Sequence, residues 1–181
     1  MSMNKKLISD DSLKAYEIRF KEMQKEKDTD KGDELFIVKM VAISEQINNL
    51  HVKAKVNDFE IENDGPKDLG GSGEIPGPMP MLLASLANCL EITALLYLSY
   101  SNIKVKSIKV KVEAEFDKRS ALNPKEEPFP GLFDLNVTWS LNSKENFKTI
   151  ERILNRVEEI CPVKGTLSRL HTFHQKIELI N

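Results

Sequence analysis

Two cysteines, Cys89 and Cys161, are the residues of this sequence best suited to covalent chemistry. Each falls on the apolar face of an expected helix, Cys89 at helical spacing from Leu86 and Thr93, and Cys161 from Val157. A free cysteine is also a small hydrophobe, so a core-filling role stays open for both. If their helices pack side by side, the two thiols could meet and form a disulfide.

Local electrostatics separate the two thiols as nucleophiles. Cys161 ends its expected helix, where the partial negative charge of the helix dipole opposes a thiolate. Cys89 lies well inside its helix and gains little from the dipole, so its activation requires a nearby cation or hydrogen-bond donor from another element. Cys161 is therefore the poorer nucleophile of the two.

Other reactive patterns find a plainer explanation. "GGSG" at residues 70–73 is followed by none of the residues of a phosphate-binding loop and predicts a turn. His171 and His174 would point to opposite faces of a strand, which is a poor arrangement for sharing a metal. We therefore expect neither a metal ion nor a bound organic cofactor.

Charge and hydropathy exclude several function classes. The 181 residues include 26 basic and 28 acidic side chains, which argues against nucleic acid as a partner. The N-terminal sequence lacks the apolar core of a secretory signal, so we expect a cytoplasmic protein with reduced thiols. Residues 79–100 are apolar enough for a membrane span, but Asn88 and Glu91 at their centre favour a buried helix and no membrane.

The N-terminal half predicts an appended helix followed by a meander. Residues 1–34 form an N-terminal amphipathic helix and a charged linker, with Asp10 or Asp11 as the expected cap. The apolar face of this helix comprises Leu13, Tyr16, Phe20 and Met23. Three strands are expected within residues 35–44, 49–56 and 59–63, and the glycine- and proline-rich residues 64–80 lead into the long apolar helix.

The C-terminal half predicts two amphipathic strands, a helix and a last strand. Hydrophobic residues alternate over 107–116 and 132–141, as in strands with one buried face. Asn142 and Glu145 suggest a capping box for a helix that ends before Pro162. Its apolar stripe comprises Phe147, Ile150, Leu154, Val157 and Cys161. With a final strand at 172–180, residues 35–181 form one α+β domain of helices packed on antiparallel sheet.

The segment "LGGSGEIPGPMPMLLASLANCL", followed by an alternating strand and then "CPVKGTLSR", resembles the osmotically inducible protein C and organic hydroperoxide resistance family (OsmC/Ohr). The similarity in element order extends over residues 35–181. It implies the OsmC-like fold, in which an antiparallel sheet accompanies a long central buried helix. It also implies an intertwined homodimer with sites at the subunit interface.

The resemblance also implies a function. Cys89 would be the thiolate that attacks an organic or lipid hydroperoxide, and Cys161 would condense with the resulting sulfenic acid to a disulfide. An external dithiol would reduce the pair again. Such a thiol-dependent peroxidase would be an antioxidant protein of the oxidative stress response.

The sequence departs from the pattern of the family's peroxidases at the groups that support the thiolate. Those enzymes carry a glutamate nine or ten residues before the first cysteine, where this chain has Pro80 and Met79. They also bring an arginine from the N-terminal region, whereas the three expected strands contain none. The candidate supporting groups are Arg19, Lys39, Glu74 and Arg169.

Two alternatives to a peroxidase follow from these departures. The chain could be an OsmC-like protein that binds a small ligand in an apolar pocket, without efficient peroxidase activity. It could also be a structural dimer whose N-terminal helix recruits a partner.

Overall fold

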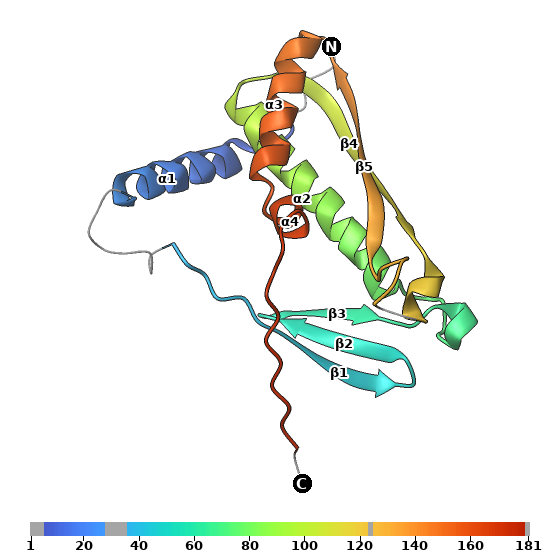
Figure 1. Ribbon diagram of the computed structural model, residues 1–181. Coiled ribbons are helices and arrows are strands. Elements are labelled where there is room, and N and C mark those ends of the chain that lie inside the picture. The colour runs from blue at the N-terminus through green and yellow to red at the C-terminus, as the bar shows by residue number, and fades with distance from the viewer. Residues whose placement is uncertain (1–5, 28–35, 123–124, 180–181) are drawn as a thin grey trace.

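A computed structural model describes residues 6–27, 36–122 and 125–179. It has the predicted α+β composition, with antiparallel sheets and helices (Figure 1). Within the described residues the strands form two separate sheets, one in the order β1-β2-β3 and one of β4 and β5, where the sequence suggested one. Most of the predicted charged linker lies outside the described residues.

The long helix α2, Pro78–Tyr100, packs against β4 and against the other three α-helices, α1, α3 and α4. Gly77 caps it in an extended conformation and Pro78 occupies its first position, where a missing N–H costs nothing. Its inner face is fully buried and comprises Leu86, Leu90, Ala94 and Leu98. Within the described residues α2 is the one helix whose length and composition would also suit a membrane span, a property that core helices of soluble proteins share.

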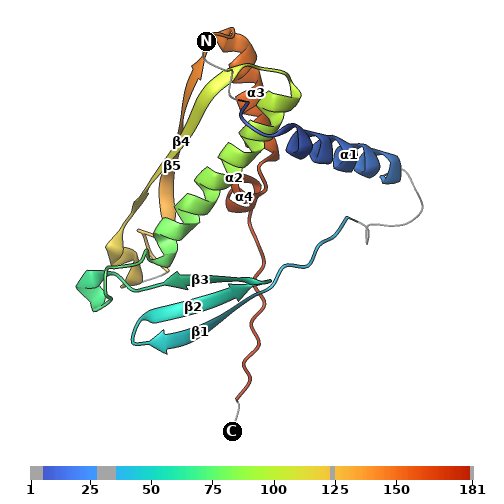
Figure 2. The ribbon, with the colours of Figure 1, turned by 180° about the vertical axis from the view of Figure 1, so that it is seen from behind.

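Strands β4, Val105–Phe116, and β5, Leu132–Ser143, form a long antiparallel ribbon beside α2 (Figures 1 and 2). Their register places Val110 opposite Trp139 and Val112 opposite Val137. These side chains pack against the core, which confirms the predicted alternation in the middle of both strands. The short η3 helix, Lys118–Ala121, begins the connection between them.

Helix α3, Phe147–Ile160, packs on α2, and the short helix α4, Pro162–Leu167, follows it directly. The predicted capping box is wrong: the cap is Asn146, whose side chain accepts from the N–H of Lys148, and Asn142 belongs to β5. The apolar stripe is confirmed at Leu154, Val157 and Cys161, which are buried. Ile153, which was not predicted, also belongs to the buried stripe. Phe147 was predicted to belong to it but is exposed, because no other described element covers the first turn of α3.

The meander of β1, Ala42–Asn48, β2, His51–Val56, and β3, Phe59–Asn63, is antiparallel as predicted. Its first strand was predicted within residues 35–44, but it begins only at Ala42 and continues past residue 44 to Asn48. Residues 36–41 form no strand because pairing with β2 ends where Ala42 meets Val56, the last residue of that strand. Residues 49 and 50 form the turn that joins β1 to β2.

The predicted last strand is also wrong for the described residues. Residues 171–179 are extended but belong to no sheet, since no strand of the same chain pairs with them. Figure 1 shows this tail leaving α4 and running away from the α2 layer. The apolar side chains of the tail are exposed: Leu170, Phe173, Ile177 and Leu179.

Helix α1, Asp10–Glu26, projects sideways from the end of α2 (Figures 1 and 2). Ser9 caps it through a hydrogen bond from the N–H of Ser12, and the two predicted caps, Asp10 and Asp11, lie in its first turn. The Tyr16 ring packs edge-on against Tyr97 and Tyr100, with centroids 6.3 and 6.2 Å away. Burial, together with its hydrogen bond to Tyr97, raises the pKa of Tyr16 to about 12.

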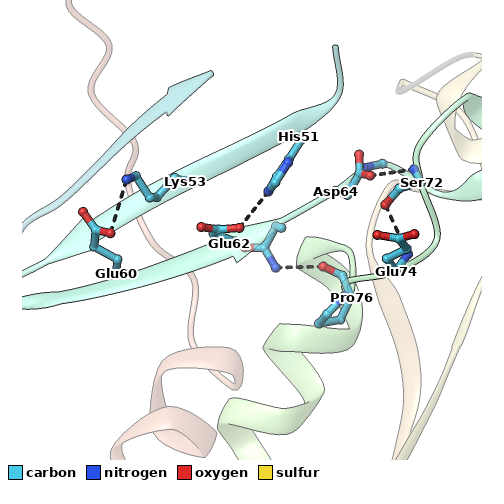
Figure 3. Close-up of polar contacts among 10 residues, drawn as sticks. His51, Lys53, Glu60, Glu62, Asp64, Ser72, Glu74 and Pro76 are labelled. Atoms are coloured by element: carbon cyan, nitrogen blue, oxygen red, sulfur yellow. Dashed lines mark hydrogen bonds and ion pairs between the residues drawn. The ribbon is translucent and has the colours of Figure 1, made fainter. Parts of the chain in front are cut away.

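A tightly hydrogen-bonded loop joins β3 to α2 and contains the short η2 helix, Lys67–Leu69 (Figure 3). The buried carboxylate of Asp64 accepts from the N–H of Gly65 at 2.7 Å and from that of Ser72 at 2.6 Å. Hydrogen bonds from Ser72, first from its side chain and then from its backbone, hold the pKa of Asp64 below its usual range. This loop fixes where α2 begins.

Gly71→Ala should destabilise the protein, because a Cβ at this position would lie 1.7 Å from the carbonyl oxygen of Gly65. We expect the free energy of unfolding, measured by urea denaturation, to fall by more than about 2 kcal/mol. Gly165→Ala is the matched control, since nothing lies within 4 Å of its added Cβ. Equal stability of the two variants would contradict this account of the loop.

Candidate active site

The packing of α3 and α4 against α2 brings the two cysteines together. Both are free thiols, and the Cys161 thiol donates to the sulfur of Cys89 at an Sγ–Sγ distance of 3.3 Å. Residues far apart in the chain thus meet as one pair, which the sequence predicted only on the condition that their helices pack together. A disulfide has an S–S length of about 2.05 Å, so a short movement would join them.

Cys161 is held at the junction of two helices. Its N–H donates to the carbonyl of Val157 at 3.0 Å as the last hydrogen bond of α3, and its side chain caps α4. Its carbonyl accepts from the N–H of Gly165 at 2.8 Å, and its Sγ accepts from the N–H of Lys164 at 3.5 Å. These three hydrogen bonds fix the position from which this sulfur faces Cys89.

The environments of the two thiols differ. Cys161 is 1% exposed, whereas Cys89 is only partly buried. Burial raises the pKa of the Cys161 thiol, the N–H of Lys164 opposes this rise, and the hydrogen bond to Cys89 adds to it. Cys161 consequently keeps its proton at neutral pH, and its S–H is available as a donor to the sulfur of Cys89.

A partly buried ion pair near Cys161 bridges α3 and α4. Lys164 Nζ donates to Glu158 Oε2 at 2.6 Å, and the indole N–H of Trp139 donates to Glu158 Oε1 at 3.0 Å. Burial would raise the pKa of Glu158, but these two hydrogen bonds outweigh it and the pKa lies below its usual value. The carboxylate is therefore charged at neutral pH and attracts Lys164.

The sequence analysis missed Glu158 and Lys164 as parts of the site. They stand six residues apart, which is no helical spacing, because the break at Pro162 separates their helices. The only signal was the short distance in sequence from Cys161. Only the structure, in which α4 follows α3 directly after the break, brings the two side chains together.

The four predicted supporting residues do not reach the thiols within this chain. Arg19, Lys39, Glu74 and Arg169 are all exposed. Among the described residues, no hydrogen bond or ion pair joins their side chains to Cys89 or Cys161. Figure 3 shows Glu74 in the loop before α2, where its N–H donates to Ser72 Oγ at 3.1 Å.

A cavity of about 450 Å³ lies between β5 and α3, and Glu158 is one of the residues that line it. Its apolar lining includes Trp139, Leu141, Ile150 and Leu154, and carboxylates stand among its polar residues. In the described part of the chain, no group of three or more His, Cys, Asp and Glu side chains could hold a metal ion.

Comparisons with known proteins agree with the resemblance seen in the sequence. A family model described as OsmC-like protein matches residues 71–174. The crystal structure of an OsmC-like protein from Mycoplasma pneumoniae is 24% identical, with a TM-score of 0.61, and the match covers 72% of this chain and 87% of that one. An organic hydroperoxide resistance protein OsmC from Legionella pneumophila is 16% identical, with a TM-score of 0.56 and coverages of 73% and 90%.

A third similar structure is an organic hydroperoxide resistance protein from Elizabethkingia anophelis, 16% identical, with a TM-score of 0.54 and coverages of 73% and 89%. At these identities the likeness shows the fold. No curated protein matched the sequence.

The sulfur contact predicts that a thiol oxidant will join the two cysteines within one chain. Diamide should consume both thiols together and lower the intact mass by the two hydrogens lost, because the sulfurs already lie 3.3 Å apart. Mass spectrometry under denaturing, non-reducing conditions measures this directly. Cys161→Ser should keep one free thiol, and disulfides found only between chains would contradict the geometry.

Proposed function

The chain belongs to the OsmC-like protein family, and on that premise we propose that it is a thiol-dependent peroxidase that reduces organic or lipid hydroperoxides. The observation that carries the proposal is the 3.3 Å contact between the sulfurs of Cys89 and Cys161. Two thiols at this distance can complete a cycle of oxidation and disulfide formation without a metal. We place this reaction in the cytoplasm, where a dithiol reductant is at hand.

The two thiols take different roles in this proposal. Cys89 attacks the peroxide, since it is the less buried of the two and its sulfur accepts the hydrogen bond of the Cys161 thiol. Cys161 resolves the product, because it is buried and keeps its proton until the second step. The difference in burial thus supports the roles suggested by the sequence, with Cys89 attacking first and Cys161 forming the disulfide second.

The chemistry balances with one external reductant. The Cys89 thiolate attacks one peroxide oxygen, the O–O bond breaks, and the alkoxide takes a proton to leave as an alcohol while Cys89 becomes a sulfenic acid. Cys161 then loses its proton and attacks the Cys89 sulfur, so that the S–S bond forms and water leaves. A dithiol reduces this disulfide by two exchange steps and is itself oxidised to a disulfide.

We further propose that the protein works as a homodimer. The chain has an accessible surface of 15143 Å², against about 8,900 Å² for a compact monomer of its mass. Apolar residues on the two unpaired segments are open to solvent, including Met40 at 84% and Phe173 at 93%. Only 22% of the most apolar window of α2 is buried. A second copy would cover these surfaces.

A dimer also offers a source for the missing activating cation. Lys39 lies in the unpaired segment before β1, and Arg169 lies at the start of the tail. Both segments would pack on the second copy in an intertwined dimer, so either cation could approach Cys89 of the other subunit. Arg19 on α1 and Glu74 in the loop before α2 remain further candidates for this role.

Binding of a small ligand is a second candidate function, favoured by the cavity between β5 and α3. Its volume of about 450 Å³ and its largely apolar lining suit a small apolar molecule with a polar end. An apolar ligand recovered from purified protein whose thiols ignore peroxide would support this function over the peroxidase.

Reduced protein mixed with one equivalent of cumene hydroperoxide should lose peroxide and both thiols in rapid sequence, leaving an intramolecular disulfide. Cys89→Ser should abolish peroxide loss, because it removes the attacking sulfur. Cys161→Ser should still consume peroxide and should accumulate a sulfenic acid at Cys89, which dimedone traps for mass spectrometry. Unchanged peroxide and thiols in the unmodified protein would rule out the peroxidase.

The proposed dimer predicts a mass of twice 20.6 kDa by light scattering at micromolar concentration. Phe173→Asp should weaken association at least about tenfold, since it would bury a charge in the interface. His174→Asp, at the neighbouring exposed position of the tail, controls for the added negative charge. A monomer of 20.6 kDa at all concentrations would contradict the dimer.

A further inference from the structure

We propose that Lys164 and Glu158 are positioning residues that hold Cys161 in line with Cys89 and so set the rate of disulfide closure; this role rests on the proposed peroxidase. Neither residue touches the sulfur of Cys89. They act through Cys161, whose place is defined by the joint between α3 and α4.

The first step of the argument is the connection from Lys164 to Cys161. Lys164 stands in the first turn of α4, and its N–H donates to Cys161 Sγ at 3.5 Å. Any movement of this turn therefore moves the donor that directs the sulfur. Because Pro162 interrupts the backbone hydrogen bonds between α3 and α4, the helices need another link to keep their angle.

The ion pair between Lys164 and Glu158 supplies that link. Its N–O distance is 2.6 Å, and its side chains are 38% and 28% exposed, so solvent screens it less than a fully exposed ion pair. Glu158 is in turn fixed by the indole N–H of Trp139 on β5, at 3.0 Å. A series of contacts thus connects Trp139 on β5 to Glu158 on α3, Glu158 to Lys164 on α4, and Lys164 to the sulfur of Cys161.

This link matters for the second chemical step and not for the first. In the first step only Cys89 and the peroxide react. In the second step Cys161 must lose its proton and approach the Cys89 sulfur along the S–O axis, from 3.3 Å to about 2.05 Å. Small errors of alignment slow such attacks strongly. Loosening α4 should therefore slow closure and leave the attack on peroxide unchanged.

The test separates the two steps in Glu158→Gln and Lys164→Met. Rapid mixing of each reduced variant with cumene hydroperoxide gives the rate of peroxide loss, and quenched samples give the rate of disulfide closure. We expect peroxide loss within twofold of the unmodified protein and closure slowed at least about fivefold, with more dimedone adduct at Cys89. Lys164→Arg should recover most of the closure rate because it keeps the cation.

Glu159→Gln is the matched control. Glu159 is the neighbour of Glu158 on α3 and pairs with Arg156 at 3.0 Å, but this pair is exposed and does not reach α4. It should leave both rates unchanged. The rate of disulfide closure should also rise with pH in every variant, since Cys161 must deprotonate before it attacks. A slowed variant should therefore show the same pH dependence at lower absolute rates. Unchanged closure in Glu158→Gln and Lys164→Met would overturn the proposal, as would equal slowing in Glu159→Gln.

A second measurement keeps this inference separate from the peroxidase itself. In glutathione redox buffers, the equilibrium between the dithiol and the Cys89–Cys161 disulfide gives the effective concentration of one thiol at the other. We expect this effective concentration to fall at least about fivefold in Glu158→Gln and Lys164→Met. A fall would support positioning even if the protein ignored peroxide, and an unchanged value would overturn it.

Discussion

The break between α3 and α4 at Cys161, packed against the buried face of α2, is the constraint on which the site depends. Val157 and Cys161 are almost fully buried against α2, together with Leu90 and Leu98. Proline at the start of α4 ends α3 and lets the chain turn at the place where the sulfur must stop. One packed joint therefore ends a helix, begins another and delivers a thiol to Cys89.

The same joint makes the two thiols unequal. A sulfur at the meeting point of three helices is necessarily buried, and burial keeps Cys161 protonated. Cys89 lies on a face of α2 that the chain covers only in part. The difference needs no special residue, because it follows from where each cysteine stands in the packing. The Cys161 thiol donates its hydrogen bond to the sulfur of Cys89, so the two cysteines are also linked electrostatically.

Elements with their own periodic pattern were predictable from the sequence, and elements that depend on distant partners were not. The alternation in β4 and β5 and the stripe of α3 report a buried face directly, so their existence and their inner residues were predicted. Residues 36–41 and 172–179 have the composition of strands but pair with no strand among the described residues, and composition cannot supply a partner. The cap of α3 was misplaced because Asn142 and Asn146 offer similar chemistry, and only the end of β5 decides between them.

The site shows the same division. The cysteine pair could be expected from two helical faces and from resemblance, but the Glu158–Lys164 link crosses a helix break and has no periodic signature. In the proposed cycle, resolution by Cys161 would use groups that one chain holds in place. Two of the candidate cations for Cys89, Lys39 and Arg169, instead stand on the unpaired segments. On the proposed dimer, attack would then require two chains and closure only one. On this proposal a monomer would keep the cysteine pair but would lack a cation from the second copy, so the first step would depend on assembly.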